Sequence, residues 1–291
     1  WRPEPEPSPA ELLRDALEEQ LTRPVEGLVA AAERLLGSPA LSALQVGAVA
    51  SGVRAVMDLG PRPPSSLDVE IGPDRRFAMT EAPLQRFKDV KDALGGTVND
   101  VVLTVVAGGL HRLLTTRGEP TRGRTLRAMV PVSVRHAGDE LGNRVAPAFV
   151  DLPVGAMSAK TRLSRVREGT RRLKASRMAM SADAIIGLGA YGPGAIVAAI
   201  ARLASHAPVF NLVVSNTPAP QQPMYLAGAR LVANYPSMPI GRTSALSVAC
   251  TSLAGTMAFG LTGDREGMPD LGTLADAMDD ALAELAKAAG V

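Results

Sequence analysis

The sequence predicts an α/β fold in which helices flank a mixed sheet. Patterns typical of helices and of strands are interleaved along the 291 residues, but they do not alternate strictly as β-α-β units. This arrangement argues against a fully parallel, doubly wound sheet. Hydrophobic residues make up 46% of the chain and charged residues 21%, which provides enough apolar side chains for a substantial core.

The N-terminal part is predicted to be a connector. Residues 1–9, WRPEPEPSP, favour an extended conformation, because proline fixes φ and lacks a backbone donor. Residues 10–66 contain helical stretches and end in the helix-breaking sequence PRPPSS, so we interpret them as a helical connector segment. The main domain is predicted to span residues 67–291.

The first half of the main domain should contain extended chain and one long helix. Residues 67–84 are predicted to be extended, with a turn at Gly72–Asp74. A helix should begin at Thr97–Asp100 and end at Gly118. Two strands are expected next, on either side of a turn: LRAMVPVSVR (126–135) and RVAPAFVDLPV (144–154).

The second half should be helical at first and then rich in strands. Residues 158–207 are predicted to be helical, and a final helix should begin at Asp270 as its N-cap. Gly255 should form a hairpin bend between the last two strands. The predicted strands are FNLVVSNTP (210–218), ARLVANYP (229–236), SALSVACTSL (244–253) and TMAFGLTGD (256–264).

Two features of the predicted helices each allow two interpretations. The Arg-rich stretch 160–177 is either a solvated helix face or a surface that attracts anionic phosphates of a coenzyme or a lipid. Gly108 and Gly109 cost about 1 kcal/mol each relative to alanine inside a helix. Either close helix packing or the passage of a ligand chain must offset this loss.

Composition excludes several classes of function. A net charge of +2 and an aromatic content of 3% argue against nucleic-acid binding, which needs a strong basic field and stacking platforms. The single Cys250 excludes an internal disulfide and a thiolate metal cluster, and its apolar surroundings predict a buried structural thiol rather than a reactive one. No signal peptide or membrane-spanning run is recognisable, so we expect a cytoplasmic location.

The usual catalytic signatures are missing. The sequence contains no Gly-x-Ser-x-Gly elbow, phosphate loop, His-Glu-x-x-His motif or paired-cysteine zinc spacing. Its three histidines, His111, His136 and His206, have no Asp or second His at a spacing that would orient a general base. We therefore expect all three to be structural or surface residues, and we expect no metal site.

Four polar residues lie where apolar elements begin or end. Asn99 and Asp100 lie at a predicted helix start, where they either cap the helix or position a polar substrate group in a cleft. Ser215 and Asn216 end a buried-looking strand just before a proline-containing turn. They either satisfy the turn backbone or place a hydroxyl and an amide against a developing oxyanion.

Several motifs resemble one known family. TVNDVVLTVVAGGLHRLL, MVPVSVR followed by GN, VVSNTPAPQQPMYLAGARL and FGLTGDREGMPD are similar, in type and order, to the C-terminal portion of bacterial wax ester synthase/diacylglycerol acyltransferases, and IGPDRRFA resembles that family's segment before the Asn-Asp helix. The resemblance extends from about residue 10 to the end. It implies the C-terminal half of a two-domain CoA-dependent acyltransferase fold, similar to chloramphenicol acetyltransferase, with residues 67–291 as the acyltransferase domain.

The resemblance also implies a chemistry and a partner. The family's general base is a histidine of a His-His-x-x-x-Asp-Gly motif in the first half, and this chain lacks that motif. We therefore expect the N-terminal half, as a cleaved or separate chain, to supply the base for acyl transfer from acyl-CoA to diacylglycerol or a long-chain alcohol. Acyl-CoA is a substrate here, and no cofactor is expected.

The resemblance assigns roles to individual residues. It implies that Asn99 and Asp100 shape the substrate tunnel, while Ser215 and Asn216 position the substrate and support an oxyanion. A further set of matching residues has an expected structural role: Arg135, Gly142 and Asn143.

Two hypotheses follow. The split-enzyme hypothesis predicts a wide, exposed apolar face on this chain, because a surface built to pack on another domain is uncovered without it. The binding-module hypothesis describes a non-catalytic acyl-CoA or lipid-binding module with the same fold, and it predicts a closed surface. Lipid substrates are compatible with peripheral contact to membranes or lipid droplets, although no segment requires it.

Overall fold

A six-stranded mixed sheet forms the centre of the fold, in the order β1-β8-β7-β4-β2-β3. Strands β2, β4 and β7 run parallel, whereas β1 and β8 at one edge and β3 at the other are antiparallel to their neighbours. The predicted mixed sheet is thus confirmed. The strands are β1 (Arg75–Pro83), β2 (Thr125–Ser133), β3 (Val145–Pro153), β4 (Leu212–Pro218), β7 (Leu246–Leu253) and β8 (Thr256–Asp264).

The computed structural model describes residues 60, 62–133, 145–179 and 209–291. These residues belong to one compact unit, which consists of Leu59–Met180 and Ser205–Val291. Most of the predicted connector, residues 1–66, lies outside the described residues. Its last part does contact the domain, because Arg62 donates a hydrogen bond to the backbone oxygen of Phe210 (2.7 Å).

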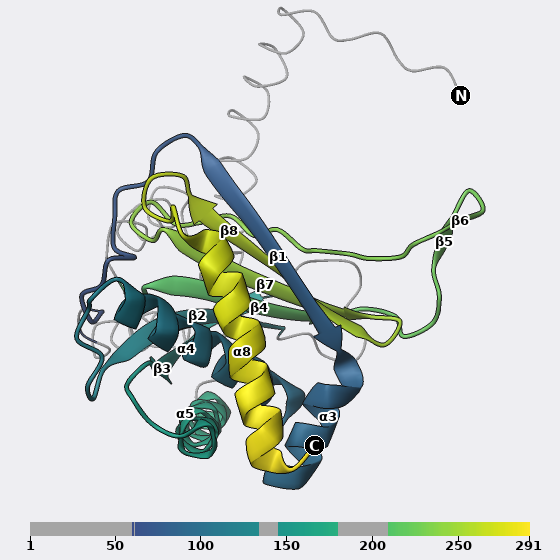
Figure 1. Cartoon of the computed structure of the whole chain (residues 1–291), viewed down its shortest axis with the longest axis horizontal. Coiled ribbons are helices and arrows are strands. Elements are labelled where there is room, and N and C mark those ends of the chain that lie inside the picture. Colours follow the sequence, from purple (N-terminus) through teal and green to yellow (C-terminus); the bar gives the residue numbers. More distant parts are fainter. Residues whose placement is uncertain (1–59, 61, 134–144, 180–208) are drawn as a thin grey trace, which may run out of the picture. The chain divides into compact units, whose positions relative to one another are not determined.

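Helices cover one face of the sheet (Figure 1). Helices α4 and α8 pack against each other and against the sheet, and α5 lies beside α4 and β3. A separate two-stranded hairpin, β5 (Tyr225–Leu226) and β6 (Ala229–Arg230), projects away from the sheet. The helices are α3 (Leu84–Leu94), α4 (Val98–Thr116), α5 (Ala159–Ala179) and α8 (Leu271–Ala289).

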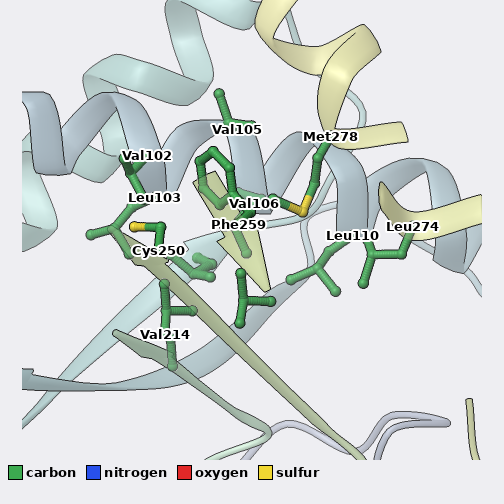
Figure 2. Close-up of a cluster of buried hydrophobic side chains, with 14 of the residues drawn as sticks. Val102, Leu103, Val105, Val106, Leu110, Val214, Cys250, Phe259, Leu274 and Met278 are labelled. Carbon is green, nitrogen blue, oxygen red and sulfur yellow. The ribbon is translucent and has the colours of Figure 1, made fainter. Parts of the chain in front are cut away.

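The core lies between this helical layer and the sheet. Figure 2 shows apolar side chains of α4 and α8 meeting side chains of the central strands, among them Val214, Cys250 and Phe259. Cys250 is buried, and its burial raises the pKa of the thiol to about 12. The prediction of a buried structural thiol is therefore confirmed, because a thiol with so high a pKa stays protonated and unreactive.

The two glycines of α4 allow close helix packing. A Cβ on Gly108 would lie 2.7 Å from the Cβ of Ala281 on α8, and a Cβ on Gly109 would lie 2.6 Å from Cγ of Met278. Carbon atoms in contact normally remain about 3.5–4.0 Å apart. Close packing against α8, rather than the passage of a ligand chain, explains why α4 contains these glycines.

Most of the predicted elements that lie within the described residues are confirmed, with two differences. Helix α3 was not predicted, although its buried Leu84, Phe87 and Val90 have helical spacing. The predicted strand 229–236 is mostly wrong, because only Ala229 and Arg230 pair, and they pair within the hairpin. Of the predicted helical residues 158–207, α5 accounts for those up to Ala179, and residues 180–208 lie outside the described part.

The hairpin between β7 and β8 agrees with the prediction. Leu253 pairs with Thr256 across the two-residue loop Ala254–Gly255, where both φ angles are positive. This conformation matches the right-handed twist of the flanking strands. Among the described residues, no single helix has the length and hydropathy of a membrane span, and only α3 and α4 together, bent by 101°, meet these criteria.

Candidate functional site

Two of the predicted site residues meet at one edge of the helical layer. Asn99 lies in the first turn of α4, and Asn216 lies near the end of β4. The Nδ2 of Asn216 donates a hydrogen bond to the Oδ1 of Asn99 (3.2 Å), although the residues are 117 positions apart in the sequence. Both side chains are partly accessible. The structure thus brings together the Asn-Asp and Ser-Asn motifs.

This amide pair retains unused hydrogen-bonding groups. Each asparagine side chain offers two N–H donors and one carbonyl acceptor, and the contact between them uses one donor and one acceptor. The Nδ2 of Asn99 and the Oδ1 of Asn216 make no other side-chain hydrogen bond within the described residues. The pair can therefore donate to a ligand carbonyl and accept from a ligand hydroxyl or amide at the same place.

Asp100 holds the start of α4 in place. Its backbone N–H donates to Oγ1 of Thr97 (3.2 Å), and its Oδ2 accepts from the backbone N–H of Thr97 (2.8 Å), which is a capping box. Its Oδ1 accepts from the hydroxyl of Thr170 on α5 (2.7 Å). Both carboxylate oxygens are thus occupied in a buried position. Of the two interpretations of Asp100, the geometry supports the helix cap, which in turn fixes the neighbouring Asn99.

Ser215 lies on the opposite face of the sheet from Asn216. Side chains alternate between the two faces along a strand, and Val214 belongs to the core beneath the helices. Asn216 reaches α4 on that face, so Ser215 points to the other one. Its hydroxyl makes no hydrogen bond within the described residues. The side chains of Ser215 and Asn216 therefore do not meet at one point. If Ser215 contacts a substrate, it does so on the second face of the sheet.

The second face of the sheet is partly covered by the segment Tyr235–Met238. Two contacts fix this segment across β8 and β7: the hydroxyls of Ser237 and Thr262 lie 3.1 Å apart, and Oγ of Ser247 donates to the backbone oxygen of Met238 (2.6 Å). The segment passes so close to β8 that a Cβ on Gly260 would lie 1.9 Å from the backbone oxygen of Pro236. Only glycine fits at this crossing.

A row of small residues leads across the strands from this crossing to Ser215. Across the strands, Gly260 pairs with Ala249, and Ala249 pairs with Ser215. All three residues lack bulky side chains, and Ser215 is buried. The hydroxyl of Ser215 therefore lies among buried residues with small side chains on the second face.

No described histidine forms a catalytic arrangement. The Nδ1 of His111 lies 2.9 Å from the backbone oxygen of Val154, which supports the expected structural role. His136 and His206 lie outside the described residues, as do Arg135, Gly142 and Asn143. Among the described residues, no group of three or more His, Cys, Asp or Glu side chains could hold a metal ion.

A buried network of hydrogen bonds at the start of β4 was not predicted from the sequence. Asn211 is fully buried, and its Oδ1 accepts from the backbone N–H of Arg127 (2.8 Å), while its Nδ2 donates to the backbone oxygen of Pro63 (2.7 Å) and to Oδ1 of Asp68 (3.0 Å). Asp68 also pairs with Arg62 (3.1 Å). Burial raises the pKa of the Asp68 carboxyl, and the bonds from Asn211 and Arg62 counteract this effect. The network anchors the strand that carries Ser215 and Asn216.

One signal in the sequence could have revealed Asn211. It is the polar residue that directly precedes the apolar run LVV in FNLVVSNTP. A buried asparagine in such a place must have all its polar groups paired. Its contacts with residues 63 and 68 are too distant in sequence to be predicted from spacing.

The hairpin and Val232, two residues after it, carry the most exposed large apolar side chains of the described chain. Leu226 is 82% exposed and Val232 is 88% exposed, and Tyr225 lies beside Leu226 with 65% exposure. Figure 1 shows the hairpin extending away from the helices and the sheet. These side chains give the chain some exposed apolar surface, in the direction that the split-enzyme hypothesis predicted, but they lie on and beside a projecting hairpin and do not form a wide face.

Comparisons with known proteins agree with this fold. The "WS/DGAT C-terminal domain" matches residues 141–286, and the "wax ester synthase/diacylglycerol acyltransferase catalytic domain" matches residues 1–102. The solved wax ester synthase/diacylglycerol acyltransferase from Marinobacter aquaeolei VT8 is 30% identical, with a TM-score of 0.65 over 84% of this chain and 57% of that one. The starter condensation domain of rhizomide synthetase is similar in fold alone, with 12% identity and a TM-score of 0.51.

Relatives with assigned names cover most of this chain. A putative diacylglycerol O-acyltransferase of Mycobacterium tuberculosis is 37% identical over 233 residues, which cover 77% of this chain and 46% of that protein. The O-acyltransferase WSD of Acinetobacter baylyi is 32% identical over 73% of this chain and 46% of that protein. The chain spans about half the length of these relatives. With its fold, its motifs and these matches, the chain belongs to the wax ester synthase/diacylglycerol acyltransferase family.

Proposed function

We propose that this chain is the C-terminal half of an O-acyltransferase that moves a fatty acyl group from acyl-CoA to diacylglycerol or a long-chain alcohol. The observation that carries the proposal is the contact between Asn99 and Asn216, in which two family motifs form one amide pair with free donors and acceptors. Relatives that match 73–77% of the chain are named as O-acyltransferases. The N-terminal half of the same enzyme is the proposed partner.

In the proposed reaction, the acyl group moves directly from the sulfur of CoA to the oxygen of the acceptor alcohol. A histidine of the N-terminal half takes the proton from the acceptor hydroxyl, and the oxygen attacks the thioester carbonyl. The C–S bond then breaks, and the CoA thiol leaves with a proton returned by the histidine. Within this chain, amide N–H groups of the Asn99–Asn216 pair hold the acyl-CoA through a carbonyl oxygen.

The exposed hairpin supports the proposed partner. Leu226 and Val232 are almost fully exposed in this chain, and isolated two-stranded hairpins are only marginally stable in water. Packing of these side chains against the N-terminal half would remove them from water. We also propose a cytoplasmic location with peripheral contact to membranes or lipid droplets, because the substrates are lipids.

The test measures release of free CoA from a long-chain acyl-CoA and diacylglycerol. This chain is assayed alone and after mixing with its native N-terminal half, and we expect turnover only in the mixture. Asn99→Ala and Asn216→Ala should each lower turnover by tenfold or more, and Asn234→Ala, at an exposed asparagine in the segment after the hairpin, should leave it unchanged.

The binding-module hypothesis makes a different prediction for the same samples. It predicts saturable acyl-CoA binding by this chain and no CoA release in the mixture. Turnover by this chain alone would contradict both hypotheses, because it would require a general base among His111, His136 and His206.

A further inference from the structure

Arg162 on α5 carries a buried charge that no carboxylate balances directly. Its side chain is only 4% exposed. Its Nε donates to the backbone oxygen of Pro153 (3.2 Å), and its Nη2 donates to the backbone oxygen of Gly155 (3.0 Å), but it forms no ion pair in the described part of the chain. Removing a guanidinium from water without a charged partner is unfavourable by several kcal/mol. An anion bound beside it would compensate for this loss.

The remaining nitrogen of Arg162 is available to a cavity of about 230 Å³. Its Nη1 makes no hydrogen bond within the described residues, and it lies 3.8 Å from the position that a Cβ on Gly108 would occupy. The cavity is several times larger than the volume of about 30 Å³ that one water molecule takes up. The described residues of its wall are Gly108, His111, Arg112, Met157, Arg162 and Glu284.

The cavity wall has a net positive charge. Among the residues that the structure describes, it contains two arginines and one carboxylate, and Arg112 already donates to Oε2 of Glu284 (3.1 Å). Glu284 forms its ion pair with Arg112 and acts on Arg162 only at longer range, so the two arginines share one carboxylate. Asp280 lies 3.7 Å from Arg112, but it is largely exposed and does not line the cavity.

His111 adds a neutral hydrogen-bonding group to the same wall. Because a backbone oxygen can only accept, the Nδ1 that lies 2.9 Å from the oxygen of Val154 carries the proton. Nε2 is then left for a ligand. It can accept a hydrogen bond from a ligand hydroxyl.

We propose that this cavity binds a phosphate group, either on a soluble molecule or on a lipid headgroup. Arg162 and Arg112 approach from two different helices, and His111 supplies a third group. A phosphate offers three or more oxygens to such a set, whereas a carboxylate offers two. The site is separate from the Asn99–Asn216 pair, because His111 follows Asn99 by 12 residues on α4, a rise of about 18 Å.

The test is isothermal titration calorimetry of the 291-residue chain with inorganic phosphate in a phosphate-free buffer. We expect saturable binding, at least tenfold tighter than the binding of acetate. Arg162→Lys and Arg112→Gln should each weaken phosphate binding tenfold or more. Glu284→Gln should strengthen it severalfold, because it removes the negative charge from the wall. Arg172→Gln is the matched control on α5, where Arg172 is 78% exposed, and it should change nothing.

The source of the phosphate is distinguished with phosphatidylcholine vesicles that contain or lack phosphatidic acid. Vesicle binding that needs phosphatidic acid, Arg112 and Arg162 assigns a lipid headgroup, and phosphate binding without vesicle binding assigns a soluble molecule. Absence of saturable phosphate binding, an equal effect of Arg172→Gln, or weaker binding by Glu284→Gln would overturn the proposal. The Arg112 and Glu284 substitutions lie on accessible side chains, so they decide the question even if Arg162→Lys fails to fold.

Discussion

Arg117 and Asp270 join the end of α4 to the beginning of α8 through two parallel hydrogen bonds. Nε of Arg117 donates to Oδ2 of Asp270 (2.9 Å), and Nη2 donates to Oδ1 (2.5 Å). Asp270 is the predicted N-cap residue of α8, but its side chain makes no capping bond. Its carboxylate instead holds the neighbouring helix, and Arg117 lowers the pKa of this carboxyl.

This contact should contribute measurably to stability. Hydrogen bonds between charged groups contribute about 1.5–3 kcal/mol when they are shielded from water, and both side chains are mostly buried. We therefore expect Asp270→Asn to lower the free energy of unfolding in urea by about that amount. Glu168→Gln removes surface ion pairs with Arg171 and Arg172, and it should leave the free energy of unfolding nearly unchanged. Equal effects of the two substitutions would contradict this view of the contact.

Asp264 should make the fold sensitive to acid. Its carboxylate accepts hydrogen bonds from the backbone N–H groups of Gly267 (2.8 Å), Gly72 (2.8 Å) and Glu266 (3.1 Å), and the bond from Gly267 is the main cause of its lowered pKa. Because the pKa is lower in the folded state, the stabilisation is complete above the unfolded pKa of about 4. It is lost as the pH falls through the folded value.

The corresponding measurement is the free energy of unfolding between pH 7 and pH 2. Asp264→Asn should be less stable than the wild type at pH 7, and the difference should shrink below pH 4. Asp68 acts with the opposite sign, because its pKa is raised by burial. In Asp68→Asn, the loss of stability between pH 7 and pH 2 should therefore be at least as large as in the wild type. A pH-independent difference between wild type and Asp264→Asn would exclude the assigned role.

Replacing Gly260 or Gly272 by alanine should change the free energy of unfolding in opposite directions. A Cβ on Gly260 would lie 1.9 Å from the backbone oxygen of Pro236, whereas a Cβ on Gly272 in α8 would have no atom within 4 Å. We expect Gly260→Ala to destabilise the chain by about 1–3 kcal/mol. Gly272→Ala should stabilise it by about 0.5–1 kcal/mol, because alanine favours the helix. Equal changes in urea unfolding would mean that Pro236 does not cross the sheet at Gly260.

The hairpin and the adjoining Val232 should matter for association with the N-terminal half and not for folding. Leu226→Ser together with Val232→Ser changes side chains that are over 80% exposed, so the free energy of unfolding should change by less than about 0.5 kcal/mol. Affinity for the N-terminal half, measured by calorimetry, should fall at least tenfold. Val291→Ser, at another exposed apolar residue, is the control and should retain full affinity. Unchanged affinity of the double variant would exclude the hairpin from the interface.

The sequence predicted local structure better than the contacts of the site. The start of α4 follows from Thr97 and Asp100, which are three residues apart and form a capping box. The strand predicted for residues 229–236 failed, because residues of high strand propensity such as Val232 form a strand only when a neighbouring strand pairs with them.

The candidate site shows the same limit. Adjacent strand residues point to opposite faces, so the sequence already contained the separation of Ser215 from Asn216. The partner of Asn216 depended on how α4 lies over β4, and a spacing of 117 residues gives no indication of that. Asn211 was missed for the same reason, since its partners are Pro63 and Asp68.

The Asn99–Asn216 pair should behave as one unit in catalysis and as a weak contact in folding. A single hydrogen bond between neutral groups contributes about 0.5–1.5 kcal/mol, so the coupling energy of Asn99→Ala and Asn216→Ala in urea unfolding should stay within that range. In CoA release by the mixture with the N-terminal half, the double variant should lose no more activity than the more damaging single variant, because either substitution already disrupts the pair. Additive losses of activity would show that the two amides act on the substrate independently, and that their contact is only structural.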